Sequence, residues 1–266
     1  FAGIPVEVEI GSEFRYRNEP FEVGTVVIAI SQSGETADTL AALNKAKEQG
    51  LLTLGIVNVV GSTIVRETKA GVYNHAGPEI GVASTKAFLC QLTTLLLMAI
   101  YFAKDKKSLP KNLFKEIESI PKKIERVLAQ AKLVEKIATK YKNFNHFLFL
   151  GRRYNYPTAL EGALKLKEIS YIHAEGYGAG EMKHGPIAMI SKDFPTLAIM
   201  PKNGVADKMH SNLEEIKARG GPIVVVATEG DEQVNSLTSD VLCIPPTLEM
   251  LAPLLAVVPL QLFAYY

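Results

Sequence analysis

Residues 26–36 read Val-Val-Ile-Ala-Ile-Ser-Gln-Ser-Gly-Glu-Thr, and this stretch decides the fold class. The apolar run at 26–30 predicts a buried strand, and a helical pattern begins at Ala37. The turn between them, residues 31–36, contains three hydroxyls, one amide and one glycine. A strand that passes through such a turn into a helix is typical of an α/β fold.

The turn also predicts a ligand. Backbone N–H groups at a helix N-terminus, together with nearby hydroxyls, bind phosphate well. We therefore predict that a phosphorylated ligand binds at the turn of residues 31–36. The alternative is that the hydroxyls are ordinary N-caps, each worth about 1 kcal/mol. The position at the carboxyl end of a strand, where open α/β sheets bind ligands, favours phosphate. Glu35 is expected to face away from the phosphate or to bind a sugar hydroxyl.

Composition excludes several classes of protein. The chain has 266 residues, 47% of them hydrophobic, and a net charge of +1, as expected for one large or two ordinary globular domains. Basic residues are spread out and balanced by acids, so no nucleic-acid partner is expected. The most apolar segments, 88–103 and 250–266, are shorter than the roughly 20 apolar residues of a membrane span. We expect buried helices there, no membrane partner and a cytoplasmic location.

The chain repeats one unit. Residues 26–58 and 195–228 both read strand, loop, helix, glycine and strand, and a long apolar helix follows each copy, at 81–104 and 249–266. This pattern predicts two tandem α/β domains, each a mainly parallel sheet flanked by helices, of flavodoxin-like or Rossmann-like type. We expect a first domain at 1–108, a helical linker at 109–143 in which Pro121 starts a second helix, and a second domain at 144–266.

The two copies differ at their beginnings. The second copy opens with an additional strand at 146–150 and a helix at 157–172, whereas only a short strand at 6–10 is expected before residue 26. We therefore expect the first domain to be truncated at its N-terminus by a strand and a helix. The apolar helix that ends at Tyr266 has no cap, so the second domain is expected to be truncated at its C-terminus.

Acid–base chemistry is predicted for the second domain. Glu161, Lys165 and Glu168 are four and three residues apart, so they share one helix face. A solvated ladder of salt bridges, worth about 0.2–0.5 kcal/mol per pair, is the alternative. The glycine-rich loop at 176–180 and the tightly held His184 that follow favour proton transfer between neighbouring sugar carbons. The glycines lack a strand–turn–helix setting and the chain lacks clustered metal ligands, so neither a cofactor nor a metal is expected.

At this point the chain resembles a known family, the tandem sugar-isomerase (SIS) domains of glutamine:fructose-6-phosphate amidotransferases, also called glucosamine-6-phosphate synthases. The resemblance covers the whole chain in order. It rests on SQSGETADTL at 31–40, AGPEIGVASTKAF at 76–88, ALEGALKLKEISYIHAE at 159–175, GEMKHGP at 180–186 and VPLQLFAYY at 258–266.

The resemblance implies a reaction in which fructose 6-phosphate and ammonia become glucosamine 6-phosphate, with ammonia supplied by a glutaminase domain that this chain does not contain. It implies that Ser31, Gln32, Ser33 and Thr36 contact the phosphate and the sugar. Val82 and Ser84 resemble residues that line the same pocket. Glu168 resembles the base that moves a proton between C1 and C2, and Lys165 its hydroxyl-binding neighbour. His184 resembles the ring-opening histidine, which reaches into the neighbouring subunit of a homodimer.

Two other functions remain open on the residues alone. One is a related sugar-phosphate isomerase or deaminase, whose pocket would be similar. The other is a non-catalytic module that senses sugar phosphates, although a sensor would have little use for Glu168 and His184.

Overall fold

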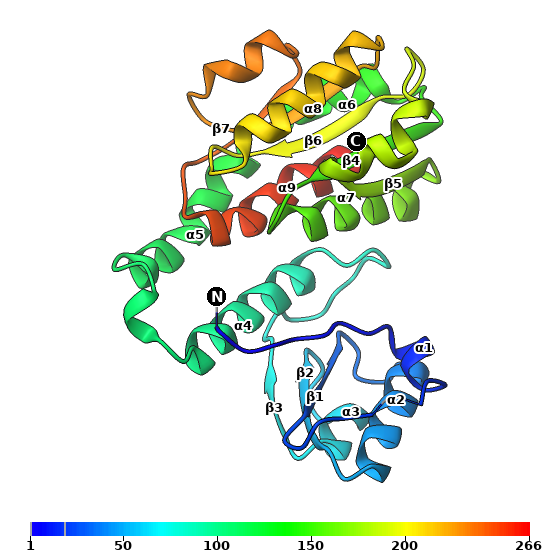
Figure 1. Ribbon diagram of the computed structural model, residues 1–266, viewed down its shortest axis with the longest axis vertical. Helices are drawn as coiled ribbons and strands as arrows, with labels where there is room; N and C mark the ends of the chain where they lie inside the picture. The colour runs from blue at the N-terminus through cyan, green and yellow to red at the C-terminus, as the bar shows by residue number, and fades with distance from the viewer. Residues whose placement is uncertain (1, 19) are drawn as a thin grey trace. The chain divides into compact units, whose positions relative to one another are not determined.

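The computed structural model describes residues 2–18 and 20–266, which form two compact units (Figure 1). The first unit ends at Leu109 and the second begins at Pro110. Each unit contains a purely parallel sheet with helices packed against it. The predicted α/β class and the two tandem sheets are therefore confirmed.

The first unit has a three-stranded sheet of order β1-β2-β3. One face of this sheet is covered by α2 and α3, because Ala29 and Val57 of the strands pack against Leu43 and Ile64 of these helices. The elements are α1 (Gly11–Phe14), β1 (Val26–Ser31), α2 (Ala37–Glu48), β2 (Leu52–Val57), α3 (Thr63–Glu67), β3 (Ala70–Tyr73), α4 (Lys86–Phe102) and the 3-10 helix η1 (Lys106–Ser108).

The opposite face of this sheet is exposed along much of its length, although Ile56 of the central strand is fully buried. Val26, Ile28 and Ile30 of the edge strand β1 are 43, 38 and 42% exposed, and Leu52 and Val72 of the neighbouring strands are exposed as well. The alternation along β1 thus points one row of apolar side chains into the core and the other row toward solvent.

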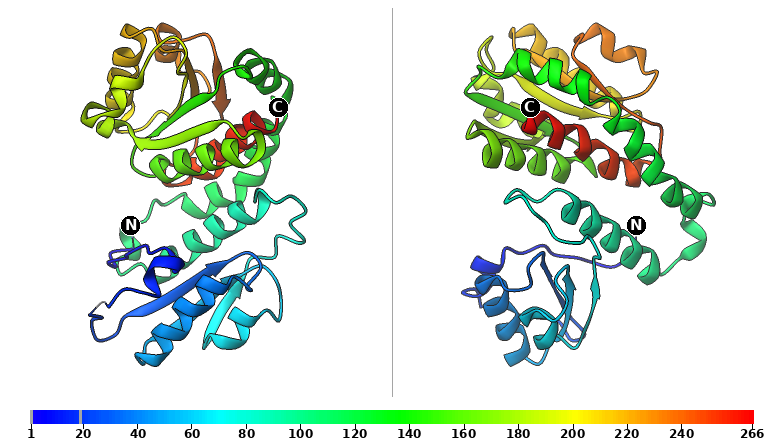
Figure 2. Two further views of the ribbon diagram at one scale, coloured as in Figure 1. Left: turned by 90° about the vertical axis from the view of Figure 1, so that its right-hand side faces the viewer. Right: turned by 180° about the vertical axis from the view of Figure 1, so that it is seen from behind.

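The second unit has a five-stranded sheet of order β5-β4-β6-β7-β8, covered on both faces. Helix α8 covers one face, and α7 and α9 lie on the other (Figure 2). The elements are α5 (Leu113–Leu128), α6 (Ala131–Tyr141), β4 (His146–Gly151), α7 (Asn155–Ser170), β5 (His173–Gly178), η2 (Ala179–His184), η3 (Pro186–Met189), β6 (Thr196–Met200), α8 (Ala206–Ala218), β7 (Ile223–Thr228), η4 (Glu232–Ser236), β8 (Val241–Ile244), η5 (Glu249–Leu251) and α9 (Ala252–Tyr265).

The internal repeat is present and extends further than the sequence indicated. The series β1-α2-β2-β3 matches β6-α8-β7-β8 in order and direction, so β3 and β8 add a strand to each copy. Both strands are only four residues long, which is too short for a clear pattern. The described residues of the first unit contain no counterpart of β4, α7 and β5.

Three local expectations are wrong. The strand expected at 6–10 does not form, and Val6 and Val8 are exposed with no neighbouring strand to pair with among the described residues. Pro121 does not start a helix, because α5 continues through it and the second helix, α6, begins at Ala131. Both helices pack on α9, so the segment predicted as a linker belongs to the second unit.

The apolar helices α4 and α9 also begin later than expected. Helix α4 starts at Lys86 rather than Gly81, and α9 starts at Ala252, one residue before Pro253. Proline is well tolerated in a first helical turn because the N–H that it lacks has no partner there. Among the described residues, no helix has the length and apolar character that crossing a membrane requires.

The glycine-rich segment is a strand and not a loop. Residues 173–178 form β5, which pairs with β4 and packs against α7. A Cβ at Gly176 would lie 2.8 Å from the Leu160 Cα atom of α7, closer than real Cβ atoms approach a backbone. Glycine therefore allows helix and strand to pack closely, as it often does where two backbones approach.

We expect Gly176→Ala to lower the free energy of unfolding by about 1–3 kcal/mol, since the added methyl group overpacks the α7–β5 contact. Gly178→Ala is the matched control, because the nearest atom to its Cβ is 3.9 Å away. Its effect should stay within about 1 kcal/mol. Urea unfolding of both variants measures the difference, and equal midpoints would contradict the packing described for β5.

Candidate active site

The carboxyl edge of the first sheet gathers several polar residues. In the parallel register Ser31 lies beside Val57, and Val57 beside Tyr73. Asn58 and Asn74 directly follow the latter two residues, so the ends of all three strands deliver polar side chains to one edge. This is the edge at which parallel α/β sheets bind ligands.

The loop at 31–36 is folded by its own hydroxyls. The Gly34 amide donates to Ser31 Oγ at 3.0 Å, and Ser31 Oγ lies 3.3 Å from Thr36 Oγ1. The Glu35 amide donates to Ser33 Oγ at 3.2 Å. These contacts bring Ser31, Gln32, Ser33 and Thr36 together in one compact turn.

The N-cap alternative is not realised for α2. Thr36 occupies the N-cap position, but its side chain makes no capping hydrogen bond to the described residues. The N–H groups of the first turn of α2 therefore stay open to an external acceptor. Open N–H groups beside clustered hydroxyls are the arrangement that suits an anion.

Gly34 and Glu35 attach this loop to the short helix α3. Gly34 has φ of +69°, and a Cβ there would lie 2.0 Å from Ser62 Oγ. Its carbonyl accepts from the Ile64 amide, and Glu35 Oε1 accepts from the Thr63 amide at 2.8 Å. The hydrogen bonds from Thr63 lower the pKa of Glu35. Glu35 is thus directed toward the N-terminus of α3, in line with the expectation that it faces away from the phosphate.

A second loop, between β3 and α4, carries Val82 and Ser84. Asn58 anchors its first part, because its side chain donates to the Gly77 carbonyl at 2.8 Å and accepts from the Ala76 amide at 2.9 Å. Val82 is fully exposed. The sequence did not identify Asn58, although a polar residue directly after an apolar strand was an available signal.

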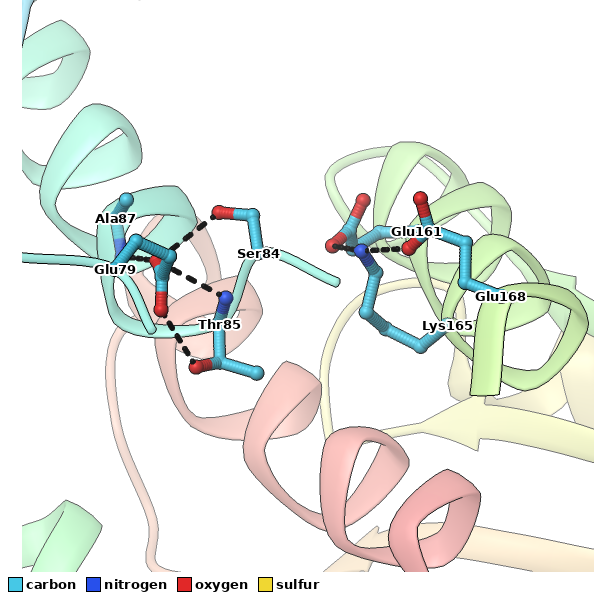
Figure 3. A network of polar contacts seen from close by, with 7 residues as sticks. All are labelled: Glu79, Ser84, Thr85, Ala87, Glu161, Lys165 and Glu168. Carbon is cyan, nitrogen blue, oxygen red and sulfur yellow. Dashed lines mark hydrogen bonds and ion pairs between the residues drawn. The ribbon is translucent and has the colours of Figure 1, made fainter. Parts of the chain in front are cut away.

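The acid–base group on α7 is a buried network. Lys165 is only 2% exposed, and its Nζ atom lies 2.5 Å from Glu168 Oε2 and 3.5 Å from Glu161 Oε1 (Figure 3). The Glu161 side chain is 11% exposed, whereas that of Glu168 is 34% exposed. This burial excludes the solvated ladder of salt bridges.

The two carboxylates therefore differ in character. Burial raises the pKa of Glu161, against the opposing attraction of Lys165. Glu161 Oε1 is buried and has no hydrogen-bond partner among the described residues, so its contact with Lys165 is an ion pair only. Glu168 instead combines a short bond to the ammonium group with access to solvent. The sequence placed Glu161 on this face, but its burial could not be deduced from spacing.

The raised pKa of Glu161 leads to a pH-dependent prediction. The folded chain holds this proton where the unfolded chain, with an ordinary pKa of 4.5, has lost it. Ionisation of Glu161 therefore removes stability as the pH rises. Glu161→Gln should become progressively more stable relative to the parent as the pH rises above about 4.5.

Urea unfolding at several pH values measures this difference. Glu135→Gln, which changes an exposed glutamate of α6, is the control and should show no such trend. A stability difference for Glu161→Gln that stays constant or falls with rising pH would contradict the assignment.

His184 stands apart from this network. It ends the 3-10 helix η2, whose Met182 is buried in the core of the second unit. Gly185 follows with φ of +144°, a conformation that other residues rarely adopt. His184 is exposed and makes no hydrogen bond or ion pair with the described residues. Nor do any three Asp, Glu, His or Cys side chains in residues 2–18 and 20–266 gather in a way that would hold a metal ion.

Comparison with known proteins shows the family of the chain. The family model described as "SIS domain" matches residues 1–101 and 140–266. Glutamine–fructose-6-phosphate aminotransferase (isomerizing) of Chlorobaculum tepidum is 53% identical over 270 residues, covering all of this chain and 44% of that relative. The chain thus spans less than half the length of that relative.

Solved structures also resemble this chain. The C-terminal domain of glucosamine-fructose-6-phosphate aminotransferase from Francisella tularensis superposes with a TM-score of 0.92 at 41% identity, covering 99% of this chain and 76% of that one. Glucosamine-6-phosphate deaminase from Thermotoga maritima has a TM-score of 0.76 at 22% identity, over 96% of this chain and 73% of that one. The second likeness concerns the fold alone.

Proposed function

Because this chain belongs to the SIS domain family, we propose that it is the isomerase portion of a glutamine–fructose-6-phosphate aminotransferase. In this function the chain converts fructose 6-phosphate and ammonia to glucosamine 6-phosphate. The ammonia comes from glutamine, hydrolysed by a glutaminase domain of the full-length enzyme. Identity above 50% to a relative of that name over the whole chain supports the proposal.

The observation that carries the proposal is the contact between Lys165 and Glu168. A lysine that is 2% exposed keeps its charge at a high cost in desolvation unless carboxylates compensate it. Proteins maintain such arrangements mainly where the charges have a task. Here the ammonium group holds a partly exposed carboxylate in a defined direction, which is what a positioned base requires.

The loop at 31–36 serves as the anchor for the substrate phosphate. Ser31, Gln32, Ser33 and Thr36 contribute hydroxyl and amide donors beside the open N–H groups of α2. Val82 and Ser84 line the same pocket. Binding at the phosphate holds a flexible open-chain sugar in place, so that proton transfer at its other end becomes an effectively unimolecular step.

The proton transfer follows from the chemistry of the intermediate. Ammonia adds to C2 of the open-chain ketose and water leaves, which gives an imine at C2. Glu168 removes a proton from C1, and the electron pair forms a C1–C2 double bond. The π pair of the C2–N double bond moves onto nitrogen at the same time, and nitrogen takes up a proton to become an amine. The same proton then returns to C2 while the hydroxyl at C1 loses its proton, which yields an amine at C2 and an aldehyde at C1. Lys165 binds the adjacent hydroxyl and holds Glu168.

His184 opens the sugar ring in this proposal, and it does so in the site of a neighbouring subunit. Its exposure and the conformation fixed by Gly185 support a role directed away from its own unit. The protein therefore acts as a homodimer in which each site is completed by the partner.

We expect Glu168→Gln in the full-length protein to reduce formation of glucosamine 6-phosphate by about 100-fold or more, since general base catalysis contributes at least this much. Binding of fructose 6-phosphate should change by less than about threefold, because the phosphate anchor is intact. Glu135→Gln, on the exposed face of α6, is the control and should retain full activity.

Other outcomes separate the alternative functions. Undiminished turnover by Glu168→Gln would show that the base is a different residue. Preferred release of ammonia from glucosamine 6-phosphate would favour a deaminase. Binding of the sugar phosphate with no turnover by the parent protein would favour a sensing module.

The role of His184 across subunits has its own test. Glu168→Gln and His184→Ala subunits are both inactive alone, but a mixed dimer contains one site with both residues intact if the histidine acts in the partner. Random mixing should then restore roughly a quarter of the parent activity. If His184 acts within its own subunit, no mixed site is complete and the mixture stays inactive.

A further inference from the structure

The loop between β3 and α4 is held at two points. Asn58 fixes its first part through Ala76 and Gly77. The second point is the carboxylate of Glu79, which lies half-buried inside the loop (Figure 3). Ile80 and Val82, which follow Glu79 in the chain, are 93 and 102% exposed and do not themselves hold the loop in place.

Glu79 accepts hydrogen bonds from both the backbone and the hydroxyls at the start of α4. Its Oε2 atom accepts from the Ala87 amide at 2.9 Å, the Thr85 amide at 3.3 Å and the Ser84 hydroxyl at 3.3 Å. Its Oε1 atom accepts from the Thr85 hydroxyl at 3.3 Å. Thr85 occupies the N-cap position of α4 without a capping bond of its own side chain, so Glu79 takes over this function.

We propose that Glu79 is a positioning residue, which holds Ser84 so that its oxygen accepts a hydrogen bond from a hydroxyl of the bound sugar. A serine hydroxyl has one proton and two lone pairs, and an ionised carboxylate can only accept. Once the proton of Ser84 points to Glu79, the lone pairs alone are left for a ligand. Ser84 is then matched to a sugar hydroxyl and not to a phosphate oxygen.

This inference rests on the proposed function, since it assigns Ser84 to the carbohydrate part of a sugar phosphate. It also assigns different parts of the ligand to the two loops. Residues 31–36 hold the anion, and the loop stabilised by Glu79 selects the sugar. Removing Glu79 should therefore weaken binding of the sugar phosphate and leave binding of free phosphate unchanged.

The test uses Glu79→Gln in the full-length protein, since an amide preserves the size of the side chain but replaces one acceptor by a donor. We expect KM for fructose 6-phosphate to rise about tenfold, as a lost hydrogen bond to a charged group implies, with kcat within about twofold. Inhibition by inorganic phosphate should also stay within about twofold. Asp105→Asn, which removes the carboxylate that caps η1, is the matched control and should leave all three values unchanged.

Coupling to Ser84 provides the second readout. If Glu79 acts through Ser84, Ser84→Ala raises KM by itself, and adding Glu79→Gln to it causes no further rise. Additive effects of the two changes would overturn the proposal, and so would a parallel loss of phosphate inhibition. Should Glu79→Gln fail to fold, Glu79→Asp replaces it, alone and in combination with Ser84→Ala. A parent protein that neither binds nor converts the sugar phosphate would instead refute the proposed function.

Discussion

The ammonium group of Lys165 has almost no contact with water, and much of the second unit is arranged so that this is possible. An unpaired buried charge would cost several kcal/mol, so Glu161 and Glu168 must remain within reach. Two glycines hold helix α7 close to its neighbours. A Cβ at Gly162 of α7 would clash with Leu260 of α9, and a Cβ at Gly176 of β5 would clash with the backbone of α7. The direction of the Glu168 carboxylate is therefore a result of helix packing and does not depend on a loop.

Under the proposed function, the two copies of one repeated fold carry different parts of a single task. In the first copy the turn after β1 kept the hydroxyls and the open N–H groups that suit an anion. In the second copy the equivalent turn, at residues 201–204, has lost the hydroxyls, and Asn203 instead caps its own turn by accepting from the Val205 amide. In the proposed function the chemistry of the second copy lies on α7, an element for which the described residues of the first unit have no counterpart.

Sequence periodicity predicted the strands and helices of the repeat, the shared face of Glu161, Lys165 and Glu168, and the compact turn at residues 31–36, because each of these depends on neighbours along the chain. It failed where contacts between distant segments decide the structure. Helix α4 begins at Lys86 because Glu79 satisfies its first N–H groups, and the glycines of β5 serve its packing on α7. The desolvation of Lys165 has no local signature, and the only local signal for Asn58 is its position directly after an apolar strand.

The exposed face of the first sheet has a practical consequence for anyone who handles this polypeptide. Strand β1 is an edge strand, and in the part of the chain that the structure describes no strand pairs with its outer side. Its exposed row of Val26, Ile28 and Ile30 lies beside unpaired backbone groups. Such an edge is a template for intermolecular strand addition, so the isolated polypeptide should be prone to aggregation at high concentration. A lysine introduced at Ile28 would improve its solubility without changing the loop at 31–36 or the network on α7.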